Sequence, residues 1–152
     1  MMKKILICVF SGTGNTRKIA NLFSDEFIKN GVETTIVDIK KGARIKCVDD
    51  FDAVGVCYPI HGFNAPYNVL EFAHDMPKTH DKPLFVLKSS GEPLALNNVS
   101  SYKLVSILKK KRIRLFCGIP LRYAVQYDIP TRRRGGIQNV AYRKKSRPRR
   151  SA

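Results

Sequence analysis

An apolar run at residues 5–9 leads directly into a loop of glycines and small polar residues, and that loop leads into a helical pattern. The loop has the sequence Phe-Ser-Gly-Thr-Gly-Asn-Thr at residues 10–16. In a strand–loop–helix unit, the loop amides and the helix N-terminus point at the same place, and glycines let an anion approach the backbone. The loop has hydroxyl and amide donors but neither a lysine nor a metal ligand. It therefore predicts a cradle for a phosphate that is held rather than transferred.

Other phosphate-binding patterns are excluded by the residues present. A Walker loop needs a lysine after its last glycine, but Gly14 is followed by Asn15. The dinucleotide fingerprint needs a third glycine where this chain has Arg17. Cys8 and Arg17 lie too far apart for a thiolate phosphatase loop. The remaining alternative is a plain Ser/Gly/Asn turn that binds nothing.

Strand-like and helix-like segments alternate along most of the chain. Apolar, β-branched runs predict strands at 4–10, 33–39, 53–58, 83–87 and 112–117. Apolar residues at helical spacing predict helices at 15–30, 66–76 and 98–111, the first of them ended by Gly31. This alternation predicts an α/β domain with a parallel sheet covered on both faces. In such a sheet, ligands bind at the carboxyl ends of the strands.

Composition limits the class of protein. A chain of 152 residues with 43% hydrophobic residues can form one globular core. The apolar run after Met1-Met2-Lys3-Lys4 is too short for a signal peptide or a membrane span, so we expect a cytoplasmic protein. Cysteines lie in three apolar segments, as Cys8, Cys57 and Cys117, which predicts core packing. No Cys-x-x-Cys run is present to hold an iron–sulfur cluster, and no metal site is expected.

The C-terminal segment breaks the pattern. Residues 121–152 contain ten basic residues and one acidic residue, and they account for more than half of the net charge of +16. Arginine-rich runs there have no apolar face to bury, so residues 126–152 are expected to be a disordered basic tail. Either the tail is a binding arm, or a truncation or frameshift has replaced the last helix of the domain.

Three loops resemble those of one known family. Ser-Gly-Thr-Gly-Asn-Thr at 11–16 resembles the FMN-phosphate loop of flavodoxins, and residues 58–66 and 88–93 resemble the two loops that hold the isoalloxazine ring. With 97–98 and 100–101, the set is most similar to the flavodoxin half of the fused flavodoxin–ferredoxin proteins of anaerobes. The resemblance extends to about residue 125. It implies a doubly wound, five-stranded parallel sheet of order 2-1-3-4-5, with the last helix missing or altered.

The resemblance also implies the contacts of the cofactor FMN. Residues implied at the phosphate are Ser11, Gly12, Thr13, Gly14, Asn15 and Thr16. Residues implied at the N5 edge and one face of the ring are Pro59, Ile60, His61, Gly62, Phe63 and Asn64. Residues implied at the pyrimidine edge are Ser89, Ser90, Gly91 and Glu92. Gly62 would let its peptide turn over when N5 gains a proton.

Several of these residues have a simpler interpretation. Phe63 and Tyr58 are each either a neighbour of the flavin ring or a residue of the core, and Phe63 is favoured as the ring neighbour. His61 is either a ring contact or an ordinary loop residue. The side chain of Glu92 is expected to point to solvent, and Lys88 is expected to be a surface residue at a strand end rather than a flavin contact.

The resulting functional hypothesis is a one-electron carrier with no catalytic residue of its own. Its positive charge favours an acidic redox partner such as a ferredoxin. One alternative is an FMN-dependent oxidoreductase of the quinone or protoporphyrinogen reductase type. Another is nucleic-acid binding through the basic tail, which would be non-specific and sensitive to salt.

Overall fold

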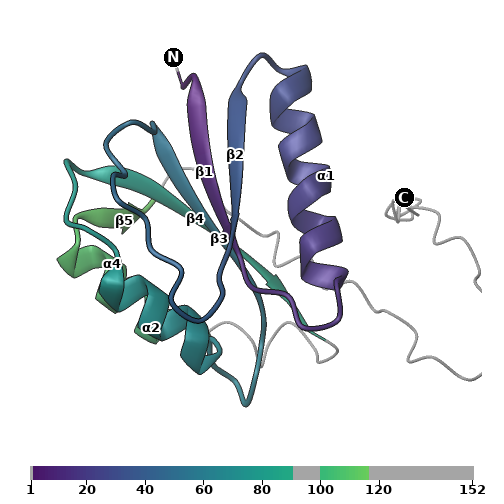
Figure 1. The fold of residues 1–152 in the computed structure, drawn as a ribbon, viewed down its shortest axis with the longest axis vertical. Helices are drawn as coiled ribbons and strands as arrows, with labels where there is room; N and C mark the ends of the chain where they lie inside the picture. Colours follow the sequence, from purple (N-terminus) through teal and green to yellow (C-terminus); the bar gives the residue numbers. More distant parts are fainter. Residues whose placement is uncertain (1, 91–99, 117–152) are drawn as a thin grey trace, which may run out of the picture.

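The computed structural model describes residues 2–90 and 100–116, and within these ranges the chain forms one five-stranded sheet. Figure 1 shows how its strands and helices are arranged. The strands are β1 (Lys4–Val9), β2 (Glu33–Asp38), β3 (Ala53–Pro59), β4 (Lys82–Ser89) and β5 (Ile113–Leu115). They pair in the order β2-β1-β3-β4-β5, and every pair is parallel. The predicted fold class and strand order are therefore confirmed, with strand ends displaced by one or two residues.

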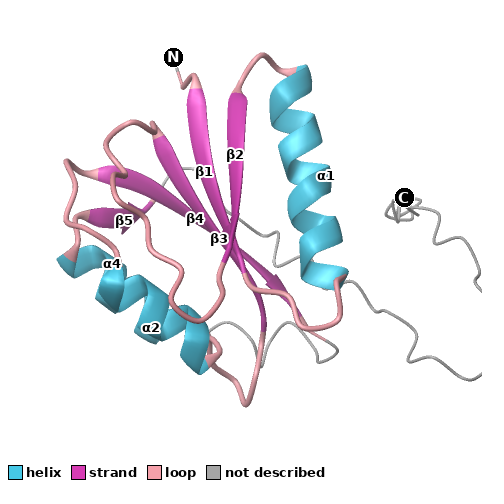
Figure 2. Cartoon of the chain, in the orientation of Figure 1, coloured by secondary structure: helices cyan, strands magenta, loops and turns pink. Residues whose placement is uncertain are grey.

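Helices cover both faces of this sheet, as Figure 2 shows. Helix α1 (Asn15–Lys29) lies on one face, and Gly31 follows it with a φ of 76°, as a helix-ending glycine requires. Helices α2 (Tyr67–Asp75) and α4 (Tyr102–Lys110) lie side by side on the other face. Helices α1 and α2 begin within one residue of their expected starts, and α4 begins at Tyr102 where a start at residue 98 was expected.

The two faces of the sheet carry separate parts of the core. Along β1, Ile5 and Ile7 point to the α1 face, while Leu6 and Cys8 point to the face of α2 and α4. Such alternation is what the two-residue period of a strand requires. Cys57 lies in the α1 part of the core, so the two described cysteines that were expected to pack in the core do so.

The connection from β2 to β3 reaches across the sheet without a helix. Residues 39–52 form neither a helix nor a strand, yet Ile39 and Val48 are buried there. Ala43, Ile45 and Phe51 pack against the same cluster, on the face covered by α2 and α4. This connection therefore covers part of one face of the sheet, as the crossover helices do after β1, β3 and β4.

Two aspartates fasten the end of this connection to the amino edge of the sheet. Asp52 Oδ2 accepts hydrogen bonds from the backbone amides of Lys3, at 2.6 Å, and Lys4, at 2.8 Å. Asp49 Oδ1 accepts from the Thr79 hydroxyl and from the backbone amide of His80, the latter at 3.0 Å. The hydrogen bonds from Thr79 and His80 lower the pKa of Asp49 to about 2. The same kind of bond, from Lys3 and Lys4, lowers the pKa of Asp52.

These carboxylates predict an acid-sensitive connection. A folded-state pKa below the ordinary value of 3.8 means that the stabilisation is complete above pH 4 and is lost as the pH falls towards 2. Urea unfolding should therefore show a free energy of unfolding that declines over this interval. The decline should be smaller in the Asp49→Asn variant.

Asp50 supplies the matched control for this prediction. It lies beside Asp49 but accepts no side-chain hydrogen bond from any residue in the described ranges. Asp50→Asn should leave the acid decline as it is in the parent protein. An equal decline in the parent and in Asp49→Asn would contradict this account of the connection.

Some of the predictions made from the sequence concern residues outside the ranges that the structure describes. The basic tail, Cys117, the altered last helix and the boundary near residue 125 lie outside the ranges 2–90 and 100–116. Within those ranges, no helix has the length and apolar character needed to cross a membrane.

Candidate functional site

The carboxyl ends of β1, β3 and β4 meet at one edge of the sheet. Val9 is paired with Cys57, and Pro59 with Ser89, so these strands end at nearly the same level. Backbone hydrogen bonds continue just past the strands, from Phe10 N to Cys57 O and from Ile60 N to Ser89 O, both at 2.9 Å. The loop at 10–14 and the loop at 60–66 therefore leave the sheet next to each other, as the sequence predicted.

The first loop presents free backbone donors at the start of α1. Gly14 has a φ of 86°, which glycine adopts without strain, and its carbonyl accepts from the Lys18 amide at 3.0 Å. Within the described residues, the backbone amides of Gly12, Thr13 and Gly14 donate to no acceptor. Free amides at a helix N-terminus, where the helix dipole is positive, make a site for an anion.

The side chains of this loop are arranged so that hydroxyl protons remain available. Ser11 Oγ accepts from the Arg17 amide at 3.3 Å, and Thr13 Oγ1 accepts from Asn15 Nδ2 at 3.3 Å. A hydroxyl that accepts one hydrogen bond can still donate its own proton. The Arg17 guanidinium is paired with Asp38 at the end of β2. The loop thus offers neutral donors, and the guanidinium of Arg17, which follows it, already has a counterion.

A buried hydrogen bond joins the first loop to the end of β4. The hydroxyl oxygens of Thr16 and Ser89 lie 2.8 Å apart, and both residues are buried. Thr16 is the second residue of α1, and Ser89 is the last residue of β4. The expected phosphate loop and the expected pyrimidine-edge loop are therefore in direct contact.

The second loop contains a tight reverse turn at residues 61–64. His61 and Asn64 exchange two backbone hydrogen bonds, each of 3.0 Å. Gly62 and Phe63 between them have φ values of 52° and 61°, the pattern of a type I′ turn. The His61 ring packs edge to face against Phe10, with the ring centroids 6.4 Å apart. This contact is a second link between the two loops.

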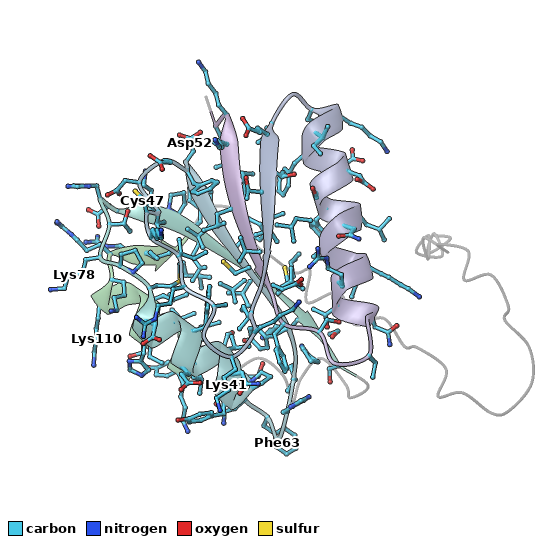
Figure 3. The ribbon with its side chains drawn as sticks, viewed as in Figure 1. Lys41, Cys47, Asp52, Phe63, Lys78 and Lys110 are labelled. Carbon is cyan, nitrogen blue, oxygen red and sulfur yellow. The ribbon has the colours of Figure 1, made fainter. Side chains whose placement is uncertain are left out.

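Phe63 occupies a conformation that a bulky residue rarely adopts. Its backbone is left-handed, and its side chain is 51% exposed. Figure 3 shows Phe63 at the tip of the loop, projecting away from the sheet. Tyr58, the other aromatic candidate for the ring contact, is fully buried in the core. Of the two aromatic residues, Phe63 is the one that can contact a ligand at this edge.

The strain at Phe63 predicts a gain in stability when the residue is replaced. Phe63→Asn should raise the free energy of unfolding by about 1 kcal/mol, because asparagine tolerates the left-handed region far better. Phe63→Ala removes the same exposed ring but keeps the unfavourable backbone, so it should give no such gain. Urea denaturation of both variants tests this, and equal stability of the two would contradict the explanation from strain.

Lys88 lies deeper than a surface residue at a strand end. Its Nζ donates to Ser100 Oγ at 3.1 Å and to Ser101 Oγ at 3.3 Å, just before α4. Partial burial lowers its pKa. Tyr58 is paired with Lys88 across the strands and is buried in the core. Burial raises the pKa of Tyr58. Sequence reasoning missed this cluster, because only the strand register shows which face Lys88 occupies.

The remaining predicted residues divide into two groups. The structure brings together the residues of the first loop, the turn and Ser89, with Ser90 directly after it. Gly91 and Glu92 lie outside the described residues, as do Asn97 and Asn98. The cofactor contacts of both groups stay predictions.

Comparison with known proteins was informative only for the fold. No protein-family model and no curated protein matches the sequence. Oxidised Flavodoxin 1 from Bacillus cereus matches with a TM-score of 0.62 and 18% identity, covering 76% of this chain and 81% of that one. The two-electron reduced flavodoxin of Megasphaera elsdenii matches with a TM-score of 0.60 and 19% identity, covering 73% and 80%. A flavodoxin from Streptococcus pneumoniae matches with 0.60 and 16%, covering 74% and 79%.

The chain has the flavodoxin fold. Sequence identities below 25% show that the strands and helices are arranged alike, but they do not show that the residues of a binding site are shared. The flavodoxin fold nevertheless places its switch point, between β1 and β3, where the free amides of the first loop lie.

Proposed function

We propose that this protein binds FMN at the carboxyl edge of the sheet and carries electrons one at a time. The observation that carries the proposal is the group of free backbone amides at Gly12, Thr13 and Gly14, at the N-terminus of α1. A phosphate monoester is the anion that this neutral cradle fits, because its charge is stabilised by amide donors and the helix dipole. The flavodoxin fold and its solved representatives support the same ligand.

The chain's own residues would hold the phosphate without a cation. Ser11 and Thr13 would donate their hydroxyl protons, since each oxygen already accepts a hydrogen bond from the loop. Hydrogen bonds to a charged acceptor are stronger than neutral ones. The Thr16–Ser89 bond would keep the phosphate loop in register with the ring-binding loops.

The turn at 61–64 would meet the reacting edge of the ring. FMN, when bound, supplies the redox chemistry, and the protein supplies position and electrostatics. Gly62 has no side chain to hinder reorientation of its peptide, so its backbone can present a carbonyl oxygen to a proton on N5. Phe63 and His61 would lie against the ring. Ile60 and Asn64 complete the loop.

The partner in this proposal is an acidic redox protein, for which an iron–sulfur ferredoxin is the natural candidate. The chain has a net charge of +16, which would speed encounter with an acidic surface at low salt. The likeness of its loops to fused flavodoxin–ferredoxin proteins of anaerobes supports the same pairing, in a reducing cytoplasm.

The phosphate cradle predicts a selective loss of FMN affinity. Replacing Ser11 or Thr13 by alanine removes one charge-assisted donor, so FMN affinity should fall by about tenfold in each variant. Riboflavin has the same ring but no phosphate, and its affinity should not change. Quenching of flavin fluorescence measures both affinities with the same protein samples.

The two flavins together make the test decisive. Equal loss of FMN and riboflavin affinity would mean that the variants disturb the fold rather than the phosphate contact. Failure of the parent protein to bind FMN more tightly than riboflavin would contradict the proposed phosphate site. Thr13→Ser is the matched control, since it keeps the hydroxyl and should retain FMN binding.

A further inference from the structure

A groove of about 690 Å³ runs between α2 and α4 on the outer surface of the domain. Its walls are two helical stripes: Tyr67, Leu70 and His74 on α2, and Tyr102, Ser106 and Lys110 on α4. Residues at this spacing lie on one side of a helix, and each stripe is about 10 to 12 Å long. Leu70 and Ile107 form an apolar floor that packs on the core below.

Two aromatic side chains stand exposed at one end of this groove. Tyr67 is 75% exposed and Tyr102 is 80% exposed, and each is the first residue of its helix. Both helices begin at the carboxyl edge of the sheet, so the two tyrosines lie at the end of the groove nearest the candidate flavin site. Exposed tyrosines beside an apolar floor are typical of the anchor positions of protein interfaces.

The groove also carries positive charge that has no counterion in the described part of the chain. Lys103 and Lys110 line it, and neither forms an ion pair with any residue in the described ranges. Lys109 and Lys111 flank Lys110 at the end of α4, likewise without an ion pair among the described residues. Among the described residues of the lining, Glu71 is the one with an acidic side chain. Figure 3 shows Lys110 reaching away from the domain at this side.

We propose that this groove is the docking surface for an acidic redox protein, which sets apolar side chains between Tyr67 and Tyr102 and carboxylates against Lys103 and Lys110. The proposal rests on the proposed function for the redox character of the partner, but the binding itself does not require FMN. The positive charge of the groove argues against a second copy of the chain or the segment 121–152 as its occupant. A second copy carries +16, and the segment 121–152 carries ten basic residues and one acidic residue, so both are repelled by the lysines.

The test uses the full chain and an acidic two-cluster bacterial ferredoxin as the probe, with calorimetry at about 0.05 M salt, where charge interactions are weakly screened. The double variant Lys103→Ala/Lys110→Ala should bind about tenfold more weakly, with a shallower salt dependence. The double variant Tyr67→Ala/Tyr102→Ala should bind at least tenfold more weakly at every salt concentration. Both tyrosines are exposed, so thermal melting should be unchanged.

Two control variants remove positive charge outside the groove, so they distinguish an effect of the groove lysines from an effect of net charge. Lys29→Ala removes a last-turn lysine from α1, on the opposite face of the sheet, as Lys110→Ala does from α4. Arg149→Ala/Arg150→Ala removes two charges from the C-terminal segment. Both controls should leave ferredoxin affinity within about twofold. Equal weakening by a control and by the groove variants would overturn the proposal, and so would the absence of ferredoxin binding by the parent protein.

The remaining outcomes are also decisive. Sedimentation should show a monomer, and a dimer that dissociates on replacing Tyr67 and Tyr102 would make a second copy the occupant instead. Ferredoxin binding that depends on the groove in a protein without FMN affinity would uphold the docking surface and reject the flavin site. If the protein binds FMN but the groove variants do not change its affinity for ferredoxin, the flavin site is upheld and the docking surface is rejected.

Discussion

The parallel pairing of β1 with β2 on one side and β3 on the other controls the rest of this structure. The chain leaves β1 towards α1 on one face of the sheet and leaves β3 towards α2 on the other face. The loops that follow the two strands therefore separate at the sheet edge, and none of the helices in residues 2–90 and 100–116 covers the edge between them. This is the switch point at which open parallel sheets bind ligands. Everything inferred about the site depends on those two loops starting from adjacent strands.

Three contacts then turn this edge into one defined unit. The Thr16–Ser89 hydrogen bond joins α1 to β4, the Phe10–His61 ring contact joins the first two loops, and the hydrogen bonds between His61 and Asn64 close the turn. The strained backbone of Phe63 is kept in place by that turn. A rigid scaffold with a few loops that carry the binding groups is a common way for a small domain to separate stability from function.

Sequence reasoning reached the α/β class and the first two loops because both depend on local patterns, whereas the strand order came from the resemblance to flavodoxins. Apolar runs and helical spacing show where elements begin, and a loop such as 10–16 carries its chemistry in consecutive residues. The Thr16–Ser89 bond joins residues 73 positions apart, so it requires the strand register. Lys88 was expected at the surface because alternation along one strand does not show which face α4 will cover. The aspartate contacts at the amino edge likewise depend on how residues 39–52 cross the sheet.

The most direct test of the central claim is an absorption titration of the protein with FMN, followed by stepwise anaerobic reduction. The account predicts flavin bands that shift on binding and a reduction that proceeds in two separate one-electron steps. Reduction in a single two-electron step would contradict the electron-carrier role and favour a substrate-converting oxidoreductase. Bands that do not shift at all would contradict the flavin site itself.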